Sequence, residues 1–309
     1  MRNNSLKNRK YVVNQITPAW NLVFTLIIIV LVVLTLIPMF LVLSISLSSA
    51  KSITLHGYKL IPMEWSLEAY KAVARMGSSV GRSYLNTIFY TAVNVIVGLF
   101  LMSMFAYVLA RKDFKYRYPV SFFIFFTTLF TGGLVPTYIL YTQHLHINNK
   151  IWVFIIPGLI QAFDIIMLRT FCQTTIPEEL FDSAKIDGAN DFQIYWHIVM
   201  PLFKAGLATV GLFNVVSKWN EWFTGILYNE NPDLQPIMTV LQKIQKTIDF
   251  LKANTEFDTS QESMEFIANL PSESTRMALA LISILPLLIM YPFFQRYFVQ
   301  GLTVGSVKG

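Results

Sequence analysis

The stretch TIPEELFDSAKIDGANDFQIYWHIVMP, residues 175–201, is the most informative part of the sequence and predicts two short helices joined by a glycine turn. Thr175 and Glu178 fit a capping box at the start of the first helix, where a proline is allowed in the first turn. Gly188 can adopt the left-handed conformation that ends a helix. Asn190, with a glutamine three residues later, repeats the capping pattern. The stretch is therefore expected to fold as a helical hairpin.

The chain as a whole is strongly apolar. It has 309 residues, of which 54% are hydrophobic and 14% are charged, and its mean hydropathy is +0.51. Average soluble domains carry about 25% charged residues, so the excess apolar surface is expected to face lipid. The net charge of +6 is then expected to lie in cytoplasmic loops. No basic run with interleaved aromatic residues indicates nucleic-acid binding.

Six apolar segments are longer than the roughly 20 residues that a helix needs to span a bilayer. They are Trp20–Leu47, Arg82–Ala110, Pro119–Tyr141, Ile151–Phe171, Leu202–Leu227 and Met277–Val299. The first is longer than the core of a signal peptide, which is about 7–15 residues, so we expect it to be retained. The predicted fold class is an all-α polytopic membrane protein, treated as one domain of residues 1–309.

The distribution of charge predicts the orientation of these spans. The N-terminal segment 1–19 and the short loop 111–118 are both basic, which is typical of cytoplasmic segments. The outer loop 51–81 is also basic, but the rule weakens for longer loops. An even number of spans then places both termini and the hairpin 175–201 in the cytoplasm. The acidic loop 228–276 is predicted to lie outside.

The loop 228–276 also carries a helical pattern. Apolar residues recur at spacings of three and four from Ile237 to Leu251, which predicts one amphipathic helix. Two interpretations stay open at this point. The helix lies on the outer membrane surface or on a partner chain, or it is a docking surface for a soluble protein outside the cell.

Motifs for catalysis, metal binding and disulfide formation are not found. Cys172 is the single cysteine, and the four histidines are scattered, so neither a disulfide nor a metal site is expected. The segment 77–81 matches G-x-S-x-G without the preceding strand that a nucleophile elbow needs. The phosphate-binding pattern G-x-x-x-x-G-K-[ST] is missing, so the chain is expected to be no enzyme and to hold no cofactor.

The hairpin resembles the EAA loop of permease subunits of ABC importers, written E-A-A-x3-G-x9-I-x-L-P. The matching positions are Asp182, Ser183, Ala184, Gly188, Ile198, Met200 and Pro201. Three of them depart conservatively, with aspartate for glutamate, serine for alanine and methionine for leucine. In that family the loop is a coupling helix that docks on the ATPase subunit and transmits its closure. The resemblance assigns this role to Glu179, Asp182, Ser183, Ala184, Asp187 and Gly188; a hairpin that merely stabilises this face is the alternative.

The likeness extends over most of the chain from about Trp20. The segments 83–87 (SYLNT), 218–223 (KWNEWF) and 234–236 (LQP) resemble maltose-type carbohydrate permeases. The segment 131–136 (TGGLVP) and the tail 297–309 resemble a branch that handles complex oligosaccharides, some of them uronate-containing, such as alginate or pectin fragments. The resemblance implies the type I importer permease fold and a place in the bacterial cytoplasmic membrane.

The resemblance also implies partners. They are a second, non-identical permease chain that supplies half of the pathway, two ATPase subunits that bind ATP and Mg²⁺, an extracytoplasmic binding protein and an oligosaccharide substrate. Transport would proceed by alternating access. A secondary transporter of a polar solute is the competing function, because that class often has ionisable residues at mid-membrane. Dependence on ATP and on a soluble partner separates the two.

An oligosaccharide path needs aromatic faces for sugar rings and polar groups for hydroxyls. Lys218, Trp219, Asn220, Glu221 and Trp222 supply both near the outer end of the fifth predicted span. The competing interpretation is an interfacial aromatic belt with a Lys218–Glu221 pair.

Two polar residues lie deeper in the predicted spans. Asn214 is a candidate to face the path. Asp164 in the fourth predicted span is costly in lipid and is expected to face protein or water. It could bind sugar, or it could pair with Arg169 or a partner chain, and the sequence does not choose between these.

Overall fold

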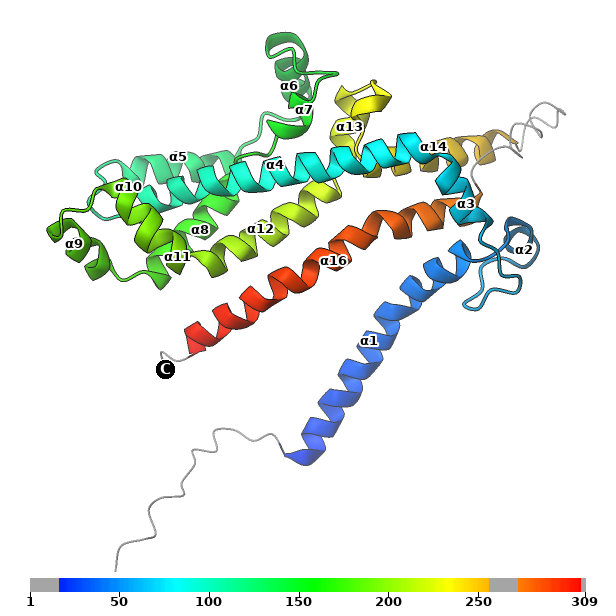
Figure 1. Ribbon diagram of the computed structural model, residues 1–309, viewed down its shortest axis with the longest axis horizontal. Coiled ribbons are helices and arrows are strands. Elements are labelled where there is room, and N and C mark those ends of the chain that lie inside the picture. The colour runs from blue at the N-terminus through cyan, green and yellow to red at the C-terminus, as the bar shows by residue number, and fades with distance from the viewer. Residues whose placement is uncertain (1–16, 256–271, 307–309) are drawn as a thin grey trace, which may run out of the picture. The chain divides into compact units, whose positions relative to one another are not determined.

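Figure 1 shows the computed structural model, which describes residues 17–255 and 272–306. Within these ranges the chain is helical and contains no strand, apart from one isolated antiparallel bridge between Ser48 and Trp65. The α-helices are α1 Pro18–Ser46, α2 Ala50–His56, α3 Glu68–Arg75, α4 Gly77–Ala110, α5 Arg117–Leu129, α6 Leu134–Ile139, α7 Trp152–Ile155, α8 Ala162–Thr175, α9 Glu178–Ile186, α10 Asp191–Ile194, α11 Met200–Leu202, α12 Lys204–Trp219, α13 Phe223–Tyr228, α14 Ile237–Thr255 and α16 Glu273–Ser306. Two π-helical turns, η1 Leu140–His144 and η2 Tyr195–Val199, and the 3-10 turn η3 Pro232–Leu234 complete the described secondary structure. The all-α prediction is confirmed.

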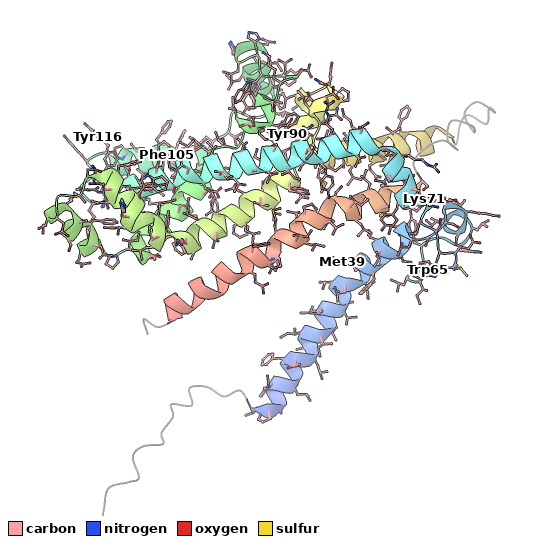
Figure 2. All side chains as sticks on the ribbon, viewed as in Figure 1. Met39, Trp65, Lys71, Tyr90, Phe105 and Tyr116 are labelled. Atoms are coloured by element: carbon pink, nitrogen blue, oxygen red, sulfur yellow. The ribbon has the colours of Figure 1, made fainter. Side chains whose placement is uncertain are left out.

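The described parts of Met1–Ala69 and Ser272–Ala278 form one compact unit, and those of Tyr70–Pro271 and Leu279–Gly309 form a second. In the first unit, α1 is a 29-residue apolar helix whose side chains are exposed along most of its length. Figure 2 shows these side chains standing out from the helix, and Met39 among them is 55% exposed. Such a surface is suited to lipid rather than to water.

Three described helices are long and apolar enough to cross a membrane by length and composition. They are Pro18–Ser46, Gly77–Ala110 and the part Glu273–Phe293 of α16, and the count rises to five if two bent helix pairs each form one span. The third predicted span is one such pair, since α5 and the α6–η1 segment meet at 108° around Gly133. The number of six spans stays a prediction.

The fourth predicted span, Ile151–Phe171, is not one helix. It consists of α7 and α8, separated by a non-helical segment at residues 156–161. Because lipid offers no hydrogen bonds, irregular backbone at membrane depth needs protein partners. Asn94 Nδ2 donates to Ile155 O at 2.8 Å, and Lys218 Nζ donates to Pro157 O at 2.6 Å. Side chains from α4 and α12 therefore satisfy two carbonyl groups at the break, those of Ile155 and Pro157.

The core of the second unit is built around α4. In Figure 1 this helix runs alongside α8 and α12, and it packs against both. Small residues allow close approach: a Cβ on Gly98 of α4 would lie 2.5 Å from Leu159 O in the break, and one on Gly206 of α12 would meet the Phe171 ring at 2.8 Å. Met102, Leu168 and Phe203 are among the fully buried side chains between these helices.

The prediction of a helix in the loop 228–276 is confirmed. The stripe from Ile237 forms α14, which begins with the fully buried Ile237. In the outer loop 51–81, Ser66 Oγ accepts at 3.2 Å from the backbone N of Glu68, the first residue of α3. Four acidic residues of the loop 228–276, at positions 256, 258, 262 and 265, lie outside the described residues. So do residues 307–309 of the tail.

Candidate coupling hairpin and translocation path

The hairpin begins where α8 ends. Ile176 precedes a proline, which disfavours helical backbone, and it is extended with φ −108° and ψ 111°. Pro177 is also extended and is the N-cap of α9, without a side-chain cap. The predicted capping box of Thr175 and Glu178 is therefore wrong: Thr175 is the last residue of α8, and Glu178 is the first of α9.

The turn and the second cap are confirmed. Gly188 has φ +82°, the left-handed conformation that ends α9. Asn190 Oδ1 accepts from Gln193 N at 2.9 Å, and Gln193 Oε1 accepts from Asn190 N at 2.8 Å, which is a complete capping box for α10. The turn of the hairpin is thus set by two local features, the left-handed Gly188 and the capping box at the start of α10.

The hairpin has an inner and an outer face. Phe181 and Ala184 are buried, at 8% and 7% exposure, and belong to the main core. The other assigned coupling residues are exposed: Glu179, Asp182, Ser183, Asp187 and Gly188. Ile186 lies among them with 86% of its surface exposed. A groove of about 290 Å³ opens beside Gly188, between the end of α9 and the second helix. The outer face is acidic, with the exposed apolar side chains of Leu180 and Ile186, and Ala184 supports it from beneath.

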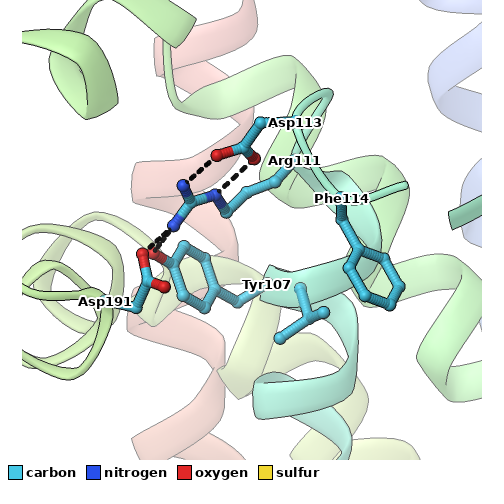
Figure 3. Close-up of a pocket in the computed structure, with 6 residues that line it drawn as sticks. Tyr107, Arg111, Asp113, Phe114 and Asp191 are labelled. Atoms are coloured by element: carbon cyan, nitrogen blue, oxygen red, sulfur yellow. Dashed lines mark hydrogen bonds and ion pairs between the residues drawn. The ribbon is translucent and has the colours of Figure 1, made fainter. Parts of the chain in front are cut away.

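A network of charges joins the hairpin to the end of α4 (Figure 3). Arg111 follows α4 directly, is only 9% exposed, and pairs with Asp113 and with Asp191 at the start of α10. Its guanidinium also donates to the Tyr107 hydroxyl at 2.9 Å. Lys185, near the end of α9, pairs with the same Asp113. Arg111 and Asp113 line a pocket of about 260 Å³ with Tyr107, Val108, Phe114 and Asp191.

The electrostatics of this network favour the charged forms of Asp113 and Arg111. Hydrogen bonds from Arg111 first, and then from Lys185, hold the pKa of Asp113 far below its usual range although partial burial opposes this. The hydrogen bond to Asp113 is likewise the largest influence that raises the pKa of Arg111. Nearby, the hydrogen bond and charge of Glu178 raise the pKa of Lys112. Asp113 and Arg111 therefore attach the hairpin as a charged pair.

Sequence reasoning did not find Arg111, Asp113 or Asp191 as functional candidates. The basic loop 111–118 was noticed only for its orientation signal. The ion pair between Arg111 and Asp191 joins residues that are 80 positions apart, and no periodicity or spacing connects them. Only the packing of the hairpin against α4 brings them together.

Two candidates for the path meet in the core. Asn214 Nδ2 of α12 donates to Asp164 Oδ2 of α8 at 2.8 Å, and both residues are buried. Of the alternatives for Asp164, its partner in the described chain is an amide rather than Arg169. Lys218 forms no ion pair with Glu221 in the described residues, since its Nζ lies on Pro157 O. Glu221 Oε1 instead accepts from Thr224 N at 3.0 Å, next to the start of α13.

The remaining candidates differ in exposure. Trp219 is 1% exposed, and its Nε1 donates to Ser283 O at 2.8 Å, so no face of its ring is open to a sugar. Asn220 is exposed and donates to Val216 O at 2.8 Å. Trp222 is 37% exposed, with Lys246 Nζ 5.7 Å from its ring centroid. The structure thus separates a buried Trp219 from an accessible Trp222.

Comparisons with known proteins agree with this architecture. Residues 74–304 match the family described as "Binding-protein-dependent transport system inner membrane component". The chain is 35% identical over 273 residues to the polygalacturonan/rhamnogalacturonan transport system permease protein YtcP of Bacillus subtilis, with 88% of this chain and 92% of that protein covered. It is 33% identical over 276 residues to the Bacillus subtilis protein LplC, covering 89% and 90%.

A solved structure is also similar. A chain from the crystal structure of a bacterial ABC transporter involved in the import of the acidic polysaccharide alginate superimposes with a TM-score of 0.77 at 27% identity, covering 93% of this chain and 100% of that one. The chain belongs to the binding-protein-dependent transport system inner membrane components and is a membrane permease of an ABC importer. The predicted family and fold are confirmed, and the secondary-transporter alternative is set aside.

Proposed function

We propose that this chain forms one half of the translocation pathway of an importer for oligosaccharides, including uronate-containing ones. A second, non-identical permease chain supplies the other half. An extracytoplasmic binding protein delivers the sugar, and two ATPase subunits, which bind ATP and Mg²⁺, supply the energy. The permease lies in the cytoplasmic membrane with both termini inside. Similarity to permeases of polygalacturonan and alginate systems supports this substrate class.

The hairpin is the observation that carries the proposal. Its outer face presents Glu179, Asp182 and Asp187, which form no ion pair within the described residues, beside the 86% exposed Ile186. Leu180 of the same helix is also exposed, at 40%, and exposed apolar surface rimmed by polar residues marks protein contacts. We infer that this face docks in the ATPase subunit. Ala184 acts from beneath, because it is buried in the core, and Gly188 sets the turn.

The experiment is affinity purification of the chain from its native membrane in mild detergent, with identification of the bound proteins by mass spectrometry. We expect an ATPase, a second permease and a binding protein. Ile186→Glu should lower the recovered ATPase at least tenfold, since a buried charge at an interface is costly. Lys115→Glu, at an exposed position in the basic loop 111–118, should leave the recovery of the ATPase unchanged. A chain that never retains an ATPase would contradict the proposal.

A further inference from the structure

Three consecutive residues after α4 hold the hairpin at three points. Arg111 pairs with Asp191 at the start of α10, Lys112 with Glu178 at the start of α9, and Asp113 with Lys185 near the end of α9. We call residues 111–113 the clamp. Neither helix of the hairpin can move away from α4 without breaking at least one of these ion pairs.

The contacts of the clamp are not equal. Lys112 and Glu178 are 71% and 41% exposed, and exposed ion pairs contribute little. Arg111 is 9% exposed and binds two carboxylates and a phenol, so its removal leaves several groups without a partner. Arg111 Nε also donates to Asp113 Oδ1 at 2.8 Å, which makes that pair bidentate. Arg111 is therefore the residue on which the clamp depends.

The opposite end of α4 holds a different segment. Asn86 Nδ2 donates to Asp233 O at 2.8 Å, and Tyr90 Oη donates to Leu234 O at 3.1 Å. Ile237 N donates to the buried Thr87 Oγ1 at 2.8 Å. These residues fix 233–237, from the end of η3 to the first residue of α14, which the predicted topology places outside the membrane. The motifs SYLNT and LQP of the sequence thus meet here.

The helix between these two ends is continuous, whereas the spans on either side of the hairpin are interrupted. α4 has 34 residues without an internal proline, about 51 Å at 1.5 Å per residue. Before the hairpin, α8 begins only after the break at residues 156–161. After it, the segment Asp191–Leu202 meets α12 at 76°. A displacement of the hairpin passes more rigidly through α4 than through the helices to which it is covalently joined.

We propose that α4 is a rod that transmits movement of the hairpin to the outer segment 233–237, and that Arg111 is the positioning residue that attaches the hairpin to it. This rests on the proposed docking of the hairpin in an ATPase. Closure of the ATPase would then directly displace the outer segment 233–237 beside α14. Arg111 contacts neither sugar nor nucleotide in this scheme. It determines how much of the hairpin's movement is transmitted through α4 to residues 233–237.

The experiment uses the complete complex purified from its membrane. Glu230→Cys places a fluorescent bimane label on an exposed position next to the outer segment, and the buried Cys172 stays unlabelled. Trapping with ATP and vanadate closes the ATPase subunits. We expect an emission shift in the otherwise native complex. Arg111→Gln should remove most of that shift, because the hairpin then loses its buried attachment to α4.

Matched variants separate transmission from folding. Arg111→Lys keeps the charge but loses the fork and should give an intermediate shift. Asp191→Asn should resemble Arg111→Gln, and the double variant should be no worse than either. Asn86→Ala, at the far end of α4, should also reduce the shift, with ATPase recovery unchanged. Lys115→Gln should behave like the native complex.

The outcomes are distinguishable. Absence of an ATPase from the native complex would contradict the proposed function and this inference with it. A native complex that hydrolyses ATP without an emission shift would contradict the inference alone. The same holds for a full shift in both Arg111→Gln and Asn86→Ala. If Arg111→Gln does not assemble, Asn86→Ala decides.

Discussion

Asn214 on α12 donates a 2.8 Å hydrogen bond to the carboxylate of Asp164 on α8. The two residues are 5% and 9% exposed, 50 positions apart, and lie within predicted spans. Asp164 therefore faces protein rather than lipid in the described chain, as its cost in a membrane required. The bond joins the helices that precede and follow the hairpin.

The first prediction concerns this bond. Asn214→Leu keeps the approximate volume but removes the donor, so the buried carboxyl loses its hydrogen-bond partner at a cost of about 1–3 kcal/mol. The thermal unfolding midpoint of the detergent-solubilised protein should fall. Asp164→Asn is the matched control, because two amides can still form the bond. An unchanged midpoint in Asn214→Leu would show that the bond contributes nothing.

The second prediction concerns Lys218, whose ammonium caps Pro157 O at the break between α7 and α8. Lys218→Met should leave this carbonyl without a donor and destabilise the protein by about 1–3 kcal/mol in the absence of any sugar. Lys204→Met, an exposed lysine at the start of α12, is the control and should be neutral. Thermal unfolding measures both. If Lys218 serves an anionic sugar instead, the variant will keep its stability and lose uptake of oligogalacturonate but not of neutral oligosaccharides.

The hairpin and the break show what the sequence could predict. Gly188 and the Asn190 cap were predictable because each depends on neighbours within a few residues. Hydropathy alone does not separate a helix from an apolar loop, but the break at residues 156–161 carries the local turn signal Pro157-Gly158, and Gly158 has φ +74°. The stabilising partners of the break, Asn94 and Lys218, lie about 60 residues away in the sequence. The error at Thr175 has a local cause, since Pro177 extends the backbone before α9 starts.

The third prediction is the pH dependence of the clamp. The pKa of Asp113 is lowered in the folded protein, mainly by Arg111, so its carboxylate stabilises the fold above its unfolded pKa of about 3.9. This contribution is lost as pH falls from there through the lower folded pKa. The difference in unfolding midpoint between the native protein and Asp113→Asn should therefore be constant from about pH 8 to pH 5 and shrink below about pH 4. A difference that changes near neutral pH would indicate another titrating group.

The fourth prediction compares two glycines of α4. A Cβ at Gly98 would lie 2.5 Å from the backbone oxygen of Leu159, whereas a Cβ at Gly81 meets nothing within 4 Å. Both lie inside the helix, so alanine gains about 0.5–1 kcal/mol of helix stability at either position. At Gly98 this gain is outweighed, because the break must shift and overpacking costs about 1–3 kcal/mol. Gly81→Ala should therefore raise the unfolding midpoint and Gly98→Ala should lower it, when both are measured in the same detergent. Equal midpoints would mean that residues 156–161 yield without cost, and the close packing of the break against α4 would then not be what holds it in place.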